Sequence, residues 1–323
     1  MLETRPVGHT SLTLTCLGLG CASIGNLGQA VSDADADAVL HRAWQAGIRY
    51  FDTAPHYGRG RSEQRLGRFL SQQERSAYVV STKVGRVLRP GAQLPEAEGF
   101  VDPLPNDVHY DYTAAGFEES LAGSLARLGT GHADIVFVHD IGTFAHGPGN
   151  DRHFADLMSS GLPYLARLKA EGRIGAYGLG VNESAICVRV LREASLDVIL
   201  LAGRWTLLDR EAEAELVPLC RERGTRLVLG GIFNSGILAT GVVPGALFNY
   251  APADTAKLQQ VRELQRLAEE AGVELPHAAL QFGLTRPGVA SVLVGTASVA
   301  QLEQNLRNAA AALPREAAER LFG

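Results

Sequence analysis

The chain has 323 residues, 46% of them hydrophobic, and a formal net charge of -5. This length and hydrophobic content can bury a large core, which is compatible with one large barrel or with two ordinary domains. The weak negative charge provides no basic stripe for phosphate backbones, so composition excludes nucleic acid as an expected partner.

Short apolar runs alternate with amphipathic stretches along the whole chain. The apolar runs have the length expected of buried parallel strands, and the stretches between them have the three- and four-residue spacing of helices. We expect strands at residues 17–20, 48–51, 78–83, 135–139, 174–181, 198–202, 227–230 and 289–294. We expect helices at residues 33–46, 62–70, 114–128, 164–171, 183–194, 211–223 and 255–271.

Residues that commonly flank helices support these boundaries. Ser32 or Asp33 can cap the first helix, and glycines at 47, 172, 224 and 272 follow predicted last turns. Eight strand-then-helix units with right-handed crossovers predict one α/β domain over residues 1–323, a (β/α)8 TIM barrel with long loops at its C-terminal face. An open doubly wound sheet is the alternative, but no GxGxxG follows the first strand with an acid about twenty residues on.

Two connections, residues 85–111 and 141–161, are longer than the others. Both are rich in glycine or proline, and both follow strands that end in ionisable residues. Long loops in a compact domain commonly bind or cover ligands, so we expect these two to roof a substrate pocket. Surface excursions without a function are the alternative.

Four side chains suited to acid–base chemistry lie at or just after predicted strand ends: Asp52, Tyr57, Lys83 and His139. The C-terminal ends of barrel strands share one mouth, so these side chains should converge. A phenol titrates near pH 10, and a nearby ammonium is needed to stabilise its phenolate. Taken singly, Asp52 could cap a turn, Lys83 could be solvated and His139 could be a core histidine; together they favour one site.

This order and context resemble the Asp, Tyr, Lys and His tetrad of the aldo-keto reductases. Further similar segments lie at Arg61-Ser62-Glu63, Arg127-Leu128-Gly129, residues 178–182 and Gln304-Asn305, so the resemblance spans about residues 12 to 310. It implies hydride transfer, with Tyr57 as the acid/base. Asp52 would hold Lys83 charged and oriented, and His139 would hydrogen-bond the reacting oxygen.

The resemblance also implies a nicotinamide dinucleotide, held by the later strands and the last helix. Asn182 matches the family's carboxamide-binding asparagine, and residues 233–238 match the loop around the pyrophosphate. Residues 298–307 would form a helix whose N-terminus faces the adenosine phosphate. The expected cofactor-binding residues are Asn182, Phe233, Asn234, Ser235, Gly236, Gly295, Ser298, Gln301, Gln304 and Asn305.

Four positions depart from the family pattern. Ala202 stands where many relatives have a glutamine, and Gly230 stands where they have an aromatic that stacks on the nicotinamide. Gly295 and Gln301 stand where NADP-preferring relatives pair the 2'-phosphate with Lys and Arg, without which that dianion has no obvious counterion. We therefore expect NAD. NADP is the alternative, because Arg307 could reach the phosphate.

Three segments, residues 83–86, 138–142 and 201–208, are similar in sequence to a subgroup of the family. Members of this subgroup oxidise free sugars at C1. The resemblance implies oxidation of an aldose of the L-fucose, L-galactose or D-threo type to its lactone, with pyridoxal oxidation as the nearest alternative. The expected substrate-binding residues are His56, Asp140, Arg204 and Trp205. A sugar would hydrogen-bond to the polar residues of this set, whereas pyridoxal would stack on Trp205 or Phe233. Trp205 could equally be a core residue.

Two further alternatives are an NADPH-dependent aldehyde reductase and a noncatalytic subunit that senses nicotinamide state. The intact tetrad argues against the second.

The cysteines at 16, 21, 187 and 220 have no metal-ligand spacing and are too sparse for a disulfide framework. We therefore expect no metal and a cytoplasmic location. Residues 1–10 lack the apolar core of a signal peptide, and no apolar run approaches the roughly 20 residues of a membrane span. The sequence does not predict the oligomeric state.

Overall fold

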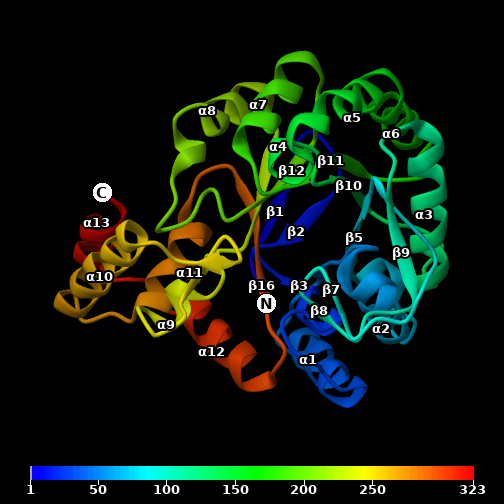
Figure 1. The fold of residues 1–323 in the computed structure, drawn as a ribbon. Coiled ribbons are helices and arrows are strands. Elements are labelled where there is room, and N and C mark those ends of the chain that lie inside the picture. The colour runs from blue at the N-terminus through cyan, green and yellow to red at the C-terminus, as the bar shows by residue number, and fades with distance from the viewer. Residues whose placement is uncertain (1) are drawn as a thin grey trace.

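Eight parallel strands form a closed barrel ringed by helices in the computed structural model, which describes residues 2–323 (Figure 1). Parallel pairing of the last strand with the first closes the ring. This confirms the predicted (β/α)8 fold and excludes the open sheet. The barrel strands are β3 (Leu17–Gly20), β4 (Tyr50–Asp52), β5 (Val79–Val84), β10 (Ile135–His139), β11 (Ala176–Val181), β12 (Val198–Ala202), β13 (Arg226–Gly230) and β16 (Val289–Gly295).

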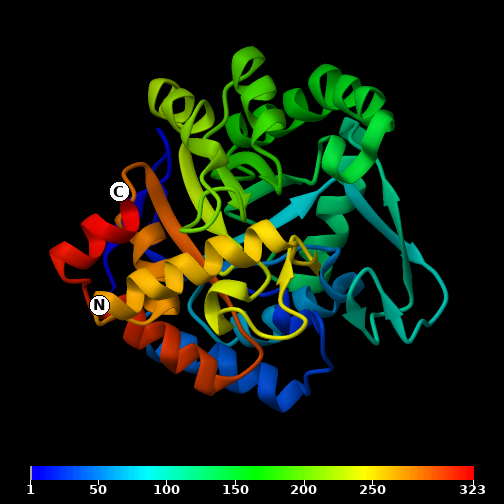
Figure 2. The same ribbon diagram turned by 60° about the vertical axis from the view of Figure 1, so that its left-hand side comes forward.

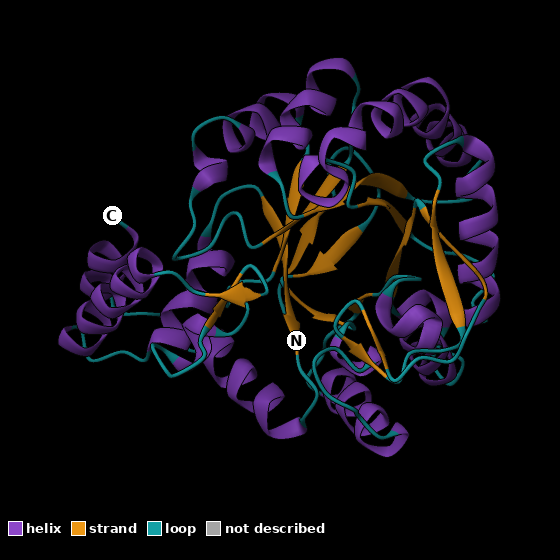
Figure 3. Ribbon diagram, in the orientation of Figure 1, coloured by secondary structure: helices purple, strands orange, loops and turns teal. Residues whose placement is uncertain are grey.

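Helices cover the outer surface of the barrel (Figure 3). Ser32 caps the first of them by accepting from the backbone N–H of Asp35. The larger helices are α1 (Asp33–Gln45), α2 (Arg61–Leu70), α3 (Ala114–Leu128), α6 (Leu162–Ala170), α7 (Ser184–Glu193), α8 (Leu216–Arg223), α10 (Thr255–Glu270), α11 (Leu275–Thr285), α12 (Val299–Ala310) and α13 (Arg315–Phe322). Within residues 2–323, no helix is long and apolar enough to cross a bilayer.

Helices α8 and α11 differ from expectation. The predicted helix over 211–223 is divided into a 3-10 turn (Glu211–Glu213) and α8. The sequence did not predict α11, in which every residue from Ala278 to Leu284 is buried. A helix buried on all sides has no polar face, so it lacks the periodic signal on which the other predictions depend.

The hydrophobic core has two parts. One lies between the barrel and the helices, and the other fills the barrel interior with side chains such as Tyr50, Phe137 and Val228. The interior cluster also includes Val7 and Leu14, which belong to an N-terminal hairpin of β1 (Thr4–Pro6) and β2 (Thr13–Thr15). The sequence did not predict this hairpin. It closes the N-terminal end of the barrel, so the C-terminal mouth remains for a site.

Three excursions follow the C-terminal ends of β5, β10 and β13 and surround this mouth. The predicted loop 85–111 contains an antiparallel ladder, β6 (Arg86–Pro90) with β9 (Asn106–Tyr110), which extends away from the barrel in Figure 2, and a small hairpin, β7 (Glu96–Ala97) with β8 (Phe100–Val101). Loop 141–161 contains α4 (Thr143–His146), α5 (Asn150–Asp156) and a π-helical turn (Leu157–Gly161). The third contains α9 (Ile237–Thr240) and a hairpin of β14 (Leu247–Phe248) and β15 (Ala251–Pro252).

Candidate active site

The four tetrad side chains meet at the mouth, three of them on neighbouring strands and Tyr57 on the turn after β4. Asp52 ends β4, Lys83 lies one residue before the end of β5, and His139 ends β10. Lys83 Nζ donates to Asp52 Oδ2 (2.7 Å), to the carbonyl of Thr53 (2.9 Å) and to Tyr57 Oη (3.0 Å). All three protons of the ammonium therefore have an acceptor, and one acceptor is the tyrosine oxygen.

A strained turn places Tyr57 over this ammonium. In the 3-10 segment Tyr57–Gly60, Gly58 and Arg59 have left-handed backbone angles of φ 62° and φ 52°. A Cβ at Gly58 would lie 2.3 Å from the carbonyl oxygen of Gly25, so no other residue fits there. The Arg59 guanidinium pairs with Glu98 and donates to the carbonyl of Asn106, which fastens the turn to the mouth.

The Asp52–Lys83 ion pair is buried, with 2% and 1% of the two residues exposed. Asp52 Oδ1 accepts a second hydrogen bond from Ser81 Oγ (2.7 Å). Burial acts to lower the pKa of Lys83, but the charges and hydrogen bonds of Asp52 and Tyr57 outweigh it and raise that pKa. The ammonium is therefore retained at neutral pH.

The proton of Tyr57 is held more firmly than the sequence analysis expected. Burial raises the pKa of Tyr57 to about 12, although the charge of Lys83 acts in the opposite direction. The predicted effect of the ammonium is present but smaller than the effect of burial. Tyr57 is consequently a phenol at neutral pH in this structure.

His139 lies against this phenol, His56 lies against His139, and both histidines are neutral. The ring centroids of His139 and Tyr57 lie 5.9 Å apart, and those of His139 and His56 lie 5.8 Å apart. Burial, with the charges of Arg86 and Lys83, holds the pKa of His139 well below its usual range, and burial lowers that of His56 to about 2. Among the described residues, Nδ1 of each histidine is buried without a partner. A buried polar atom without a partner is unusual in a folded protein, and a catalytic role is one explanation for it.

Asp140 connects His139 to Asn182, one of the predicted cofactor residues. Its Oδ2 lies 3.6 Å from His139 Nε2, and its Oδ1 accepts from Asn182 Nδ2 (3.2 Å). Arg86, which the sequence analysis did not assign, forms a buried ion pair with the same carboxylate. The available signal was its position directly after the strand that carries Lys83.

Tyr112 forms a hydrogen bond with the backbone of His139 at the end of β10. Tyr112 Oη donates to the carbonyl of His139 (2.8 Å) and lies 2.7 Å from His146 Nε2. Tyr112 was not predicted either, since it follows β9 at the end of what the sequence indicated as an irregular loop.

The two remaining predicted substrate residues have intramolecular partners. Arg204 is buried, and its guanidinium donates to the carbonyl of Asn182 (2.8 Å) and to Asn249 Oδ1 (2.8 Å). Trp205 lies in the outer core cluster and donates from Nε1 to Glu213 Oε1 (2.9 Å). This placement favours the core alternative for Trp205, which is therefore not part of the substrate site proposed below.

The predicted pyrophosphate loop begins at half-buried Phe233 and has an unusual backbone conformation. Asn234, Ser235 and Gly236 are successive residues with positive φ, and a Cβ at Gly236 would meet no atom within 4 Å. The Asn234 side chain donates to the carbonyl of Gly203 (3.1 Å) and accepts from Thr206 Oγ1 (2.6 Å). This arrangement holds the loop in place and fits a nicotinamide dinucleotide.

The start of α12 carries no positive side chain. Ser298 caps the helix by accepting from the backbone N–H of Gln301 (3.2 Å), and both Gly295 and Gln301 are exposed. A hollow beside Ser298 is also lined by Asp35. Arg307 lies in the last turn of the helix, away from this end.

The two other predicted residues of α12 lie further along the helix. Gln304 donates to Asn308 Oδ1 (3.1 Å) and accepts from Arg307 (2.6 Å), and Asn305 is buried. Both stay predictions as cofactor contacts.

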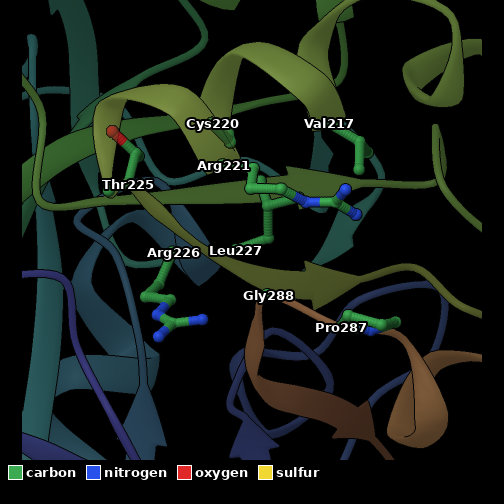
Figure 4. Close-up of a pocket in the computed structure, with 9 residues that line it drawn as sticks. Val217, Cys220, Arg221, Thr225, Arg226, Leu227, Pro287 and Gly288 are labelled. Carbon is green, nitrogen blue, oxygen red and sulfur yellow. The ribbon is translucent and has the colours of Figure 1, made fainter.

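A separate pocket of about 250 Å³ lies at the opposite end of the barrel (Figure 4). Thr225, Arg226 and Gly288 line it, at or before the first residues of β13 and β16. It therefore has no access to the tetrad. Residues 2–323 contain no cluster of three or more His, Cys, Asp or Glu side chains that could hold a metal ion.

The fold and the site together define an oxidoreductase built on a (β/α)8 barrel. The chain belongs to the aldo/keto reductase family, whose model matches residues 16–321. This confirms the family resemblance. Proteins of this family use nicotinamide cofactors and act on small molecules.

Among its relatives, the chain is 43% identical to pyridoxal 4-dehydrogenase of Microbacterium luteolum, over 94% of this chain and 92% of that protein. It is 40% identical to D-threo-aldose 1-dehydrogenase of a Pseudomonas species, over 97% and 95% of the two chains. The solved structure of the aldo-keto reductase AKR11C1 from Bacillus halodurans, in its holo form, is similar with a TM-score of 0.78 at 25% identity, covering 100% of this chain and 96% of that one.

Proposed function

We propose that this protein oxidises a cyclic hemiacetal to its lactone with NAD, and that the substrate is an aldose oxidised at C1. The observation that carries the proposal is the Lys83 ammonium, which donates to both Asp52 and Tyr57 beside the neutral His139. Two relatives are named for their action on D-threo-aldoses and pyridoxal, and both compounds form cyclic hemiacetals.

Each residue has a distinct task in this reaction. The hemiacetal hydroxyl loses its proton to Tyr57 Oη while the carbon gives up a hydride, and a carbonyl forms. His139 hydrogen-bonds the reacting oxygen without adding charge, and Lys83 stabilises negative charge on the tyrosine oxygen. When bound, an oxidised nicotinamide accepts the hydride and adds a positive charge that favours the phenolate. Asn182 and residues 233–236 would hold it.

The choice of NAD depends on the start of α12. Gly295 and Gln301 offer no charge to a 2'-phosphate, and the carboxylate of Asp35 beside Ser298 would repel one. An aldose is favoured by the polar groups at the mouth, where His56 Nδ1, His139 Nδ1 and Arg86 Nε are buried without partners among the described residues.

Pyridoxal is the second candidate. The exposed aromatic side chains of Tyr110 and Phe144 stand on two of the mouth excursions, and a planar substrate could stack on them.

One set of assays tests these proposals. Reduced-nicotinamide absorbance is followed with NAD or NADP and L-fucose, L-galactose, D-arabinose or pyridoxal, with no-enzyme blanks. We expect the fastest turnover with an aldose and NAD. Turnover of pyridoxal alone would show that pyridoxal, and not an aldose, is the substrate; the proposed mechanism would still apply. No turnover of the four, together with NADPH-dependent aldehyde reduction, would contradict the direction, the substrate class and the cofactor.

The rate of oxidation should depend strongly on pH. Because the pKa of Tyr57 is raised to about 12, its basic form is scarce at neutral pH and increases as pH rises. We expect kcat/KM for oxidation to increase from about pH 7 to about pH 10, by up to about tenfold per pH unit. The reverse reduction, which needs the protonated phenol, should not show this increase. A flat oxidation profile would show that another group accepts the proton or that chemistry does not limit the rate.

A further inference from the structure

Tyr250 is the most exposed of the large hydrophobic side chains of residues 2–323, at 66%. It lies with Asn249 in the two-residue turn between β14 and β15, and both have left-handed backbone angles, φ 52° for Asn249 and φ 61° for Tyr250. Such angles are usual for asparagine in a hairpin turn but strained for a bulky aromatic residue. An exposed aromatic held in a strained conformation is a candidate for a binding role.

Hydrogen bonds fix this turn at the barrel mouth. The backbone N–H of Tyr250 donates to Ser235 Oγ (3.0 Å), in the predicted pyrophosphate loop. The side chain of Asn249 accepts from Arg204 (2.8 Å), and Arg204 donates to the carbonyl of Asn182 (2.8 Å). The turn is therefore hydrogen-bonded directly to the predicted pyrophosphate loop and, through Arg204, to Asn182. Both are expected to hold the cofactor.

The barrel wall across from Lys83 ends in two small residues, one on β12 and one on β13. Around the closed barrel, β13 lies four strands from β5 in either direction, so it stands opposite the strand that carries Lys83. Ala202 and Gly230 are paired at the ends of β12 and β13. The atoms nearest to a Cβ at Gly230 would belong to Leu200 and Ala202, at 3.4 Å or more, so a side chain could be accommodated there without a clash.

For hydride transfer, a bound nicotinamide would present one face to the substrate carbon beside Tyr57 and His139. Its other face would then be turned toward Ala202 and Gly230, the small residues that end β12 and β13. We propose that Tyr250 stacks on this second face and positions the nicotinamide. An oxidised nicotinamide is a cation, which the face of a phenol ring attracts, so the contact favours the oxidised cofactor over the reduced one. The inference rests on the proposed function only in that the chain binds a nicotinamide dinucleotide.

Cofactor titration without substrate tests this role. Calorimetry with NAD, NADH and ADP-ribose separates the nicotinamide from the rest of the cofactor, because ADP-ribose lacks the ring. In Tyr250→Ala we expect the Kd of NAD to rise about tenfold. That of NADH should rise less, and that of ADP-ribose should stay within about twofold of the parent value. Tyr250→Phe, which keeps the ring, should bind NAD nearly as the parent does.

Leu247→Ala is the matched control, since Leu247 is an exposed residue of the same hairpin. It should leave all three dissociation constants unchanged. Equal losses for NAD and ADP-ribose in Tyr250→Ala would mean that Tyr250 only holds the loop, and an unchanged Kd for NAD would exclude contact with the ring; either result overturns the proposal. Tyr250→Leu keeps bulk at the turn and should reproduce the selective loss if the alanine variant unfolds.

These titrations involve no hemiacetal. The titrations can therefore support the role of Tyr250 even if the protein does not oxidise a hemiacetal. A failure of one proposal is distinguishable from a failure of the other.

Discussion

Tyr57→Phe should lower kcat for hemiacetal oxidation by about 10³-fold, because the substitution removes the atom that accepts the proton. NAD affinity should stay within about twofold, since the ring and its packing against Phe100 are kept. The fold should also persist. Lys83 loses one acceptor but keeps the carboxylate of Asp52 and the carbonyl of Thr53. Stopped-flow absorbance and calorimetry with NAD measure the two quantities separately.

Tyr177→Phe is a suitable control for this experiment. Tyr177 is a half-buried tyrosine on β11 whose ring lies near the Lys169 ammonium, outside the site. Its activity should equal that of the parent. If Tyr57→Phe retained more than about a tenth of the parent rate, Tyr57 would not be the principal acid/base. Unchanged cellular function in that variant would favour the noncatalytic nicotinamide-sensing alternative.

Lys83→Met should both abolish turnover and destabilise the protein by about 3–5 kcal/mol, because it leaves the buried carboxylate of Asp52 without its cation. Ser81 would still donate to that carboxylate, but one neutral hydrogen bond does not compensate for a lost charge in a site with 2% exposure. Unfolding in urea measures the free energy, and the oxidation assay measures the activity.

The double variant Asp52→Asn/Lys83→Met separates stability from catalysis. With both charges removed, the free energy of unfolding should return toward the parent value, while turnover stays lost because no ammonium supports Tyr57. A purely additive cycle, in which the double variant is as unstable as the sum of the singles, would contradict the idea that the pair acts as a unit.

The barrel could be predicted because its signals are local. Apolar runs such as residues 135–139 and 198–202 coincide with β10 and β12, and glycines at 47, 172, 224 and 272 adopt the positive φ expected after a helix. Short pairings such as β14 with β15 could not be predicted, since a two-residue strand has no periodicity of its own. Whether such a segment pairs depends on what lies beside it in the folded chain.

In the site, too, some features could be predicted from local signals and others could not. Asp52, Lys83 and His139 were recognisable because a strand end in a barrel implies a place at the mouth. The chain of contacts from Asp140 through Asn182 and Arg204 to Asn249 was not, because it joins residues more than one hundred positions apart. No local pattern encodes such a contact.

The sequence by itself determined the class of fold and the family, and it predicted that Asp52, Tyr57, Lys83 and His139 converge at the mouth, because residue type and strand position are sufficient for these. Tertiary structure alone decided the protonation of the site. The sequence predicted that an ammonium would lower the pKa of Tyr57, yet burial raises that pKa to about 12. Desolvation depends on every atom that packs around a group, and those atoms come from distant parts of the chain. The same long-range packing put Trp205 in the core and Tyr250 at the mouth.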